Sequence, residues 1–173
     1  MEHNHSHLNI HNKSGMNRHS IKDFYPLVGI LVFVCILTVI GVSIFTQNAM
    51  NAFMGYIFLV FGTLKVIKIN SFVQAYQMYD VLAMRSKAYA YLYPFLELGF
   101  GLAYILEWET KIVSAIVAPI MLIGAYGVYL KLRKKEQIPC ACLGTVFKLP
   151  MTWVTLGEDV LMAGMAITIL LYS

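Results

Sequence analysis

Long apolar runs alternate with short polar connections from residue 24 to residue 173. A helix needs about 20 predominantly apolar residues to cross a bilayer. By this rule the pattern predicts five spans, at residues 24–45, 52–69, 88–108, 112–130 and 151–172. Segment 70–87 mixes apolar and polar residues, as is typical of an amphipathic helix lying at the membrane interface. The sequence therefore predicts an all-α fold, an integral membrane helical bundle in which residues 24–173 form one transmembrane domain.

Composition supports the same class. Hydrophobic residues make up 59% of the 173 residues and charged residues only 13%, and the mean hydropathy is +0.68, far above that of an ordinary soluble domain. The formal net charge of +4 comes mainly from basic residues at the borders of the apolar runs. No basic surface interleaved with aromatic residues indicates nucleic-acid binding, so the expected surroundings are a lipid bilayer.

Residues 1–23 form a polar tail that contains all five histidines. His, Asn and Ser cannot bury enough apolar surface to offset the entropy lost on ordering, so we expect a disordered cytoplasmic tail. A sharper hypothesis is metal binding. The amino terminus and His3 could hold Cu(II) or Ni(II) in a square plane, with His5 and His7 near enough to contribute.

The distribution of Lys and Arg predicts the orientation, because cytoplasmic loops are enriched in both. The tail, the border around residues 65–87 and the connection at residues 131–148 are rich in Lys and Arg, whereas the remaining connections contain only Lys111. We therefore expect the N-terminus inside the cell and the C-terminus outside, in a multi-pass protein of the bacterial inner (cytoplasmic) membrane.

Four charged residues lie inside the predicted spans and away from the last two residues of each span. A lone charge at such a position is costly. Lys65 is the cation, and we expect it to neutralise a carboxylate, with Glu158 favoured over Glu97 because Glu158 lies at a similar depth. Asp159 is the fourth. Such a group either fixes helix register or handles a substrate or a proton. Lys65 can also snorkel to the interface.

Two of the three cysteines form a Cys-x-Cys pair, Cys140 and Cys142, between Pro139 and Pro150. The prolines indicate non-helical backbone. A disulfide across one intervening residue closes a small strained ring, and strained disulfides are the ones suited to exchange. Binding of a soft metal such as Cu(I), or two inert thiols, are the alternatives. We expect Cys35, between Val34 and Ile36, to be a buried apolar residue.

Three short motifs resemble those of the MauE/DoxX group of redox-associated membrane proteins. They are Phe61-Gly62-Thr63-Leu64-Lys65, Tyr93-Pro94-Phe95-Leu96-Glu97-Leu98-Gly99 and Cys140-Ala141-Cys142-Leu143-Gly144. The resemblance covers residues 52–171. The chain departs from the pattern at Leu143, where a Phe is usual, and at residues 155–158, where a basic residue is expected.

The resemblance implies a four-helix core and a helper in thiol-disulfide chemistry, similar to the factor that matures methylamine dehydrogenase. Any enzymatic activity would be that of a thiol-disulfide oxidoreductase without a cofactor. The partner would be a thioredoxin-like protein or a periplasmic protein with disulfides. Two alternatives remain, a metal-handling protein that uses the tail and the Cys pair, and a structural subunit that needs neither cysteine.

The alternation of Lys and Arg makes the topology testable. A phosphatase fused after Ser173 should be active outside the cytoplasm, whereas one fused after Lys135 should be inactive. In that arrangement the Cys pair begins on the cytoplasmic side, unless residues 138–146 enter the bundle as a re-entrant loop. The reverse activity pattern would contradict the five-span arrangement.

Overall fold

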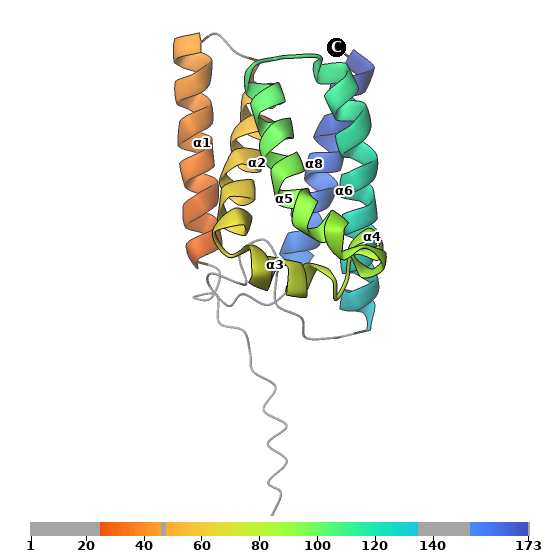
Figure 1. The fold of residues 1–173 in the computed structure, drawn as a ribbon. Coiled ribbons are helices and arrows are strands. Elements are labelled where there is room, and N and C mark those ends of the chain that lie inside the picture. Colours follow the sequence, from red (N-terminus) through yellow and green to blue (C-terminus); the bar gives the residue numbers. More distant parts are fainter. Residues whose placement is uncertain (1–24, 46–47, 135–152, 173) are drawn as a thin grey trace, which may run out of the picture.

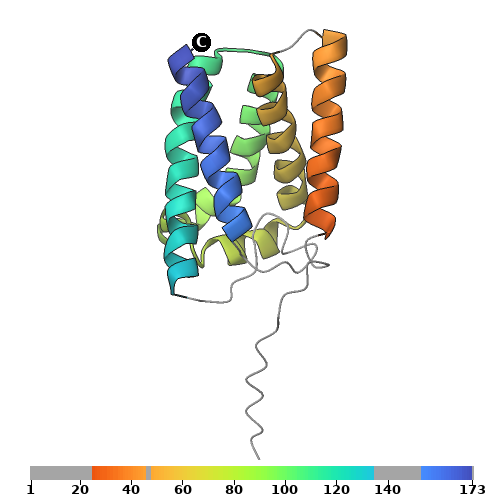
Figure 2. The ribbon, with the colours of Figure 1, turned by 180° about the vertical axis from the view of Figure 1, so that it is seen from behind.

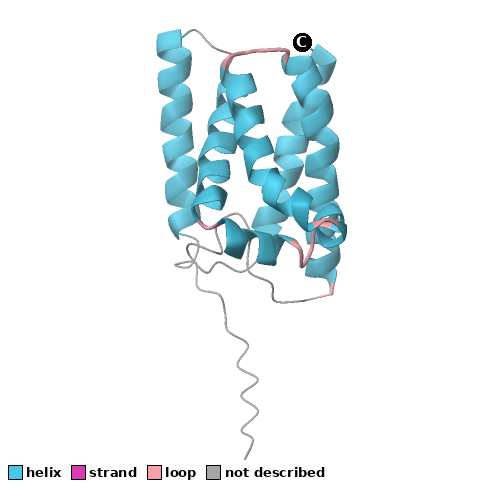
Figure 3. Ribbon diagram, in the orientation of Figure 1, coloured by secondary structure: helices cyan, strands magenta, loops and turns pink. Residues whose placement is uncertain are grey.

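A computed structural model describes residues 25–45, 48–134 and 153–172, with the side chains of the last range described from Leu156 onward. Every regular element in these ranges is a helix, as Figures 1 and 3 show. The helices are α1 (Tyr25–Phe45), α2 (Ala49–Ile67), α3 (Ile69–Tyr76), α4 (Val81–Arg85), α5 (Lys87–Ile105), α6 (Thr110–Arg133) and α8 (Trp153–Tyr172). The prediction of an all-α fold is confirmed.

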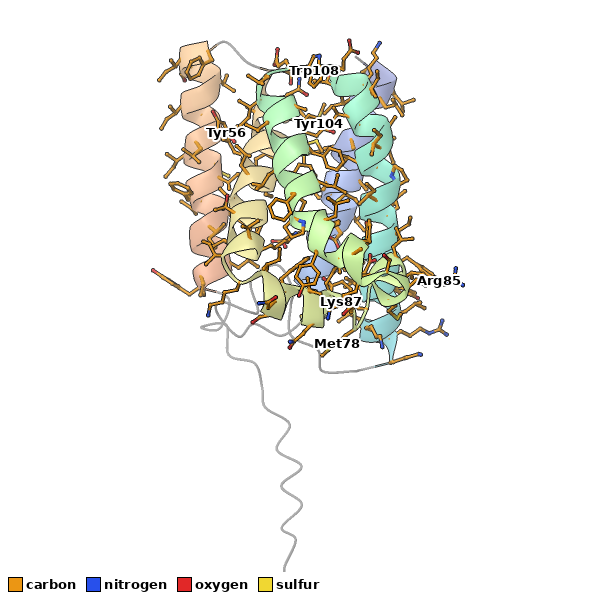
Figure 4. The ribbon with its side chains drawn as sticks, in the orientation of Figure 1. Tyr56, Met78, Arg85, Lys87, Tyr104 and Trp108 are labelled. Carbon is orange, nitrogen blue, oxygen red and sulfur yellow. The ribbon has the colours of Figure 1, made fainter. Side chains whose placement is uncertain are left out.

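The long helices pack in pairs. Helix α2 runs along α5, α6 runs along α8, and α1 packs against α2 at the outer edge of the bundle (Figures 1 and 2). The core between the pairs contains large buried side chains such as Met54, Phe58, Tyr104 and Val117. Tyr104, in the upper part of the bundle in Figure 4, shares a hydrogen bond of 2.8 Å with the Ser114 hydroxyl, which joins α5 to α6.

Among the described helices, α1, α2 and α6 are long and apolar enough to cross a membrane. The outer side of α1 is half exposed at apolar residues such as Val32, Phe33 and Ile36, a surface that suits contact with lipid rather than water. The prediction of a membrane bundle is confirmed, and the number of spans stays a prediction. Cys35 is exposed on this same helix, so the expectation that it is buried was wrong. Its place among apolar neighbours reflects a lipid-facing side and not a core.

Basic residues gather at one end of the bundle. Helices α3 and α4 lie at this end, together with the last turns of α2 and α6 and the first turns of α5 and α8 (Figure 1). Arg85 and Lys87 mark it in Figure 4, whereas Trp108 marks the opposite end. We call it the basic end, defined by Lys68, Arg85, Lys87, Lys131, Arg133 and Lys134. Such segregation is typical of the cytoplasmic side of a membrane protein.

The segment at residues 70–87 is not one amphipathic helix, as the sequence suggested, but the two short helices α3 and α4 joined by a turn. Asp80 divides them. Its buried carboxylate accepts hydrogen bonds from the backbone N–H groups of Leu82 and Ala83, at 2.9 and 2.8 Å. A carboxylate in this position caps the start of a helix. The Asp80 side chain therefore fixes the start of α4.

Glycines let α2 and α5 approach closely. A Cβ atom at Gly101 would lie 3.0 Å from the backbone oxygen of Gly55, and one at Gly62 would lie 3.3 Å from the backbone oxygen of Pro94. Small residues at such a contact are a usual device of membrane helices. Gly101 therefore has a packing role between α2 and α5. Gly99 does not, because nothing lies within 4 Å of a Cβ placed there.

This difference predicts opposite effects of two matched substitutions in α5. Gly101→Ala should destabilise the protein by about 1–3 kcal/mol, because overpacking forces the helices apart. Gly99→Ala should be neutral or slightly stabilising, because alanine is the better helix former. Unfolding of both variants in mixed micelles would measure the difference. Equal losses of stability would contradict the close contact between α2 and α5.

Candidate functional site

An ion pair joins α2 to α5 near the basic end. The Lys65 ammonium donates to Oε1 of Glu97, and both side chains are buried. The antiparallel course of the two helices explains the meeting. Side chains on a helix lean towards its N-terminus, so Lys65 leans away from the basic end while Glu97 leans towards it. Gly62, one turn before Lys65, brings α2 close enough to α5 for the two side chains to meet.

Aromatic rings surround the same ammonium group. The Lys65 nitrogen lies 5.0 Å from the centre of the Tyr93 ring and 5.6 Å from that of Phe72. A cation over a ring face at this range is stabilised by about 0.5–2 kcal/mol. Tyr76 stacks on Phe72 with ring centres 5.0 Å apart and lies 4.7 Å from Tyr93. Phe72, Tyr76 and Tyr93 therefore form an aromatic wall, and the faces of Phe72 and Tyr93 stabilise the ammonium group.

A cavity of about 70 Å³ opens beside this ion pair. Helices α2, α3, α5, α6 and α8 all contribute to its lining. Its ionisable members are Lys65, Glu97, Glu158 and Asp159, and its aromatic members include Phe72, Tyr76, Tyr79 and Tyr93. By volume the cavity can hold a few molecules of the size of water.

Two carboxylate oxygens in this lining are buried without a hydrogen-bond partner among the described residues, Oε2 of Glu97 and Oε1 of Glu158. Asp159 lies beside α6, with its Oδ2 4.0 Å from the position of a Cβ on Gly124. Three carboxyl groups thus share the cavity with one lysine. Buried polar groups normally have partners, so the unpartnered oxygens mark the place where a proton or another donor would be accommodated.

Tyr76 and Tyr79 line the cavity from α3 and the turn that follows it, at the basic end. Burial raises the pKa of both phenols well above the ordinary value, because a phenolate would lose its hydration. Both hydroxyls therefore stay protonated and uncharged at physiological pH. The backbone also holds this part in place, since a Cβ at Gly127 of α6 would overlap the carbonyl oxygen of Tyr79.

The structure brings together the four residues that the sequence singled out inside the predicted spans, Lys65, Glu97, Glu158 and Asp159. The favoured partner of Lys65 was wrong: Glu97 and not Glu158 accepts its hydrogen bond. Lys65 also does not snorkel to the interface, because its ammonium is buried between α2 and α5. Depth along the spans could not distinguish the two carboxylates, since the choice depends on which helix lies opposite.

The other predicted site residues lie outside the described ranges. These are the redox pair Cys140 and Cys142 and the metal candidates His3, His5 and His7. Within the described ranges, no group of three His, Cys, Asp or Glu side chains is placed to hold a metal ion. The cysteine segment connects α6 to α8, and both of these attachment points lie at the basic end (Figure 1).

Sequence reasoning missed the aromatic wall, formed by Phe72, Tyr76 and Tyr93, as part of the site. Phe72 and Tyr76 were expected only on an amphipathic interfacial helix, and Tyr93 only inside a span. A signal was present, since Phe72 and Tyr76 are four residues apart, as are Tyr89 and Tyr93. Residues four apart lie on one side of a helix. Two such aromatic pairs on neighbouring helices indicate a shared cluster.

Comparison with known protein families gives a match that covers most of the chain. The model of the family described as methylamine utilisation protein MauE matches residues 43–172. The chain belongs to the MauE family. No curated protein and no solved structure matches it.

The MauE match includes all the helices that line the cavity, α2, α3, α5, α6 and α8, and the segment with the Cys pair. Of α1 it includes only the last residues, from residue 43 onward. In this member of the MauE family, α1 is therefore a peripheral helix packed beside the matched region, and the site is formed without it.

The ion pair predicts a specific rescue. Lys65→Met should destabilise the protein by about 3–5 kcal/mol, because the Glu97 carboxylate is left buried and uncompensated. Adding Glu97→Gln should restore most of this loss, whereas adding Glu158→Gln to Lys65→Met should restore less. A double-mutant cycle of unfolding free energies measures the coupling. Equal rescue by both substitutions would contradict a specific pair between Lys65 and Glu97.

Proposed function

We propose that this MauE-family protein carries out thiol-disulfide exchange through Cys140 and Cys142. The observation that supports the proposal most directly is the Cys-x-Cys sequence within the matched region. The segment joins two helix ends at the basic end of the bundle. Glu158 and Asp159 follow on α8 only five and six residues after Trp153, about 7–9 Å along the helix, so the segment leads directly into the lining of the cavity.

The local charge favours a reactive thiol. Arg133 and Lys134 end α6, and Lys134 precedes Cys140 by only six residues. Positive charge near a thiol stabilises the thiolate, which is the nucleophile in exchange. One sulfur of the pair would therefore be ionised to a larger extent than an ordinary cysteine, and its neighbour two residues away would be placed to resolve the intermediate.

The exchange itself needs only a partner with a disulfide. The thiolate of Cys140 attacks one sulfur of the partner disulfide, so that a mixed disulfide forms and the other partner sulfur leaves as a thiolate. The Cys142 thiolate then attacks the Cys140 sulfur and releases the second partner thiolate. Two protons pass from the pair to the partner, which is reduced while the pair is oxidised. The reverse sequence oxidises the partner, and the two reduction potentials decide the direction.

The partner class follows from this chemistry. A thioredoxin-like protein or a disulfide-containing periplasmic protein would supply the second pair of sulfurs, and a bacterial inner membrane would be the location. Glu97, Glu158, Asp159 and Lys65 would then be groups near the exchange site that handle protons or a substrate group. Maturation of a protein with disulfides is the role that the resemblance to the MauE/DoxX group implies, and membership of the MauE family supports that resemblance.

Thiol trapping tests the proposal. A mass-tagged maleimide should label two extra sites only after treatment with dithiothreitol, because the two thiols are tied up in a reversible disulfide. Cys142→Ser should leave Cys140 joined to its partner, visible as a larger band on a non-reducing gel. The matched control is Cys35→Ser, which should change neither result, since Cys35 lies on the outer side of α1.

Two outcomes would overturn the proposal. If both cysteines stay reduced under every condition and the protein purifies with a stoichiometric soft metal, the metal-handling alternative replaces it. If the Cys140→Ser and Cys142→Ser variants retain the cellular function of the unchanged protein, the structural alternative replaces it.

A further inference from the structure

The cavity contains more acceptors than its own cation can satisfy. Lys65 occupies one oxygen of Glu97, and Glu97 is only 4% exposed. The other oxygen of Glu97 and one of Glu158 have no partner among the described residues, although both groups line the cavity. Asp159 adds a third carboxyl group to the same lining. An uncompensated charge in such surroundings is costly, so the site favours an additional positively charged donor.

Lys65 itself shows how the site holds an ammonium group. One carboxylate oxygen accepts its hydrogen bond, and two ring faces lie 5.0 and 5.6 Å from the nitrogen. The remainder of the lining repeats these elements. It offers the carboxyl groups of Glu158 and Asp159, the free oxygen of Glu97, and the aromatic residues Phe58 and Tyr79. Rings and carboxylates together are the usual means of binding ammonium groups in proteins.

Size limits what can enter. A cavity needs a volume of at least about 10–15 Å³ to hold one water molecule, and this cavity has a volume of about 70 Å³. A single ammonium ion, or the terminal ammonium group of a primary amine, fits together with some water. A bulky organic cation does not. The chemistry of the ligand matters as well as its size. Oε2 of Glu97 and Oε1 of Glu158 lack a hydrogen bond among the described residues, and an N–H group of the ligand can donate one to each.

We propose that this cavity binds a small ammonium-type cation, held by the unpartnered oxygens of Glu97 and Glu158 beside the Lys65–Glu97 pair, with Asp159 adding negative charge to the same lining. The cation is either ammonium in solution or the primary ammonium group of a small molecule or lipid headgroup. This site stands on the geometry of the described helices and does not depend on the proposed thiol exchange.

Potassium is the decisive control, because it has about the size of ammonium but no hydrogen to donate. The protein is placed in nanodiscs of phosphatidylcholine and phosphatidylglycerol, which lack a primary ammonium group. Its thermal unfolding is followed while ammonium chloride or potassium chloride is added at equal ionic strength. Ammonium should raise the unfolding temperature in a saturable manner, since a ligand that binds the native state stabilises it. Potassium should not.

Substitutions locate the bound cation. Asp159→Asn and Glu158→Gln should each weaken the apparent affinity for ammonium about tenfold or more, whereas Glu109→Gln, in the turn at the opposite end, should leave it unchanged. If either cavity variant fails to fold, the comparison of ammonium with potassium on the unchanged protein still decides. Nanodiscs that contain phosphatidylethanolamine distinguish the sources: a weaker response to added ammonium would identify the lipid headgroup as a competitor for the same site.

Three results would overturn the proposal. If ammonium and potassium raised the unfolding temperature equally, the cause would be ionic strength or a site that binds potassium as well as ammonium. No response to either salt, with Asp159→Asn more stable than the unchanged protein at neutral pH, would show that protons alone neutralise the carboxyl groups. A response that Glu109→Gln abolishes as fully as Asp159→Asn would place the cation outside the cavity.

Discussion

The cost of burying charge inside an apolar bundle governs the organisation of this protein. Lys65 and Glu97 are both buried, and each is tolerable only because the other lies opposite it on a neighbouring helix. That requirement fixes the register of α2 against α5. It also explains the glycines on the two facing helices, since Gly62 and Gly101 let the backbones come close enough for Lys65 and Glu97 to meet. The aromatic wall around the ammonium completes its stabilisation.

The same constraint links the ion pair to the rest of the basic end. Helix α8 brings two more carboxyl groups, Glu158 and Asp159, to a cavity that already contains the pair. Asp80 caps the start of α4, directly after the turn that contains Tyr79, and Tyr76 and Tyr79 both line this cavity. The proposed exchange at Cys140 and Cys142 would take place on the segment that leads into α8. Ionisable groups and reactive sulfurs would then share one end of the bundle.

Much of this architecture could be predicted from the pattern of apolar and polar residues. The five long helices begin and end within a few residues of the predicted spans, because each apolar run forms one helix between polar connections. The break at Asp80 was not predicted. The amphipathic pattern continues through this residue, and the hydrogen bonds by which Asp80 caps α4 are visible only in the structure. Cys35 was misplaced because apolar neighbours mean burial in a soluble core but lipid contact in a membrane helix.

The site was predictable as a set of residues but not as a geometry. A charged residue inside an apolar run is conspicuous, because burying its charge in a membrane costs free energy. Lys65, Glu97, Glu158 and Asp159 could therefore all be chosen from the sequence. Which carboxylate meets Lys65 depends on helix pairing, and a single sequence contains no record of that contact. The aromatic wall likewise arises from helices that are distant in the chain.

The reduction potential of the Cys140–Cys142 couple tests the central functional claim most directly. It would be measured on the Cys35→Ser protein in nanodiscs, equilibrated in glutathione buffers of graded potential and trapped with maleimide. Thiol exchange predicts one two-electron transition between about −120 and −270 mV, the range of known exchange proteins. A pair that stays reduced in the most oxidising buffer would contradict the account, as would a disulfide with a potential below about −300 mV, which is typical of a purely structural bond.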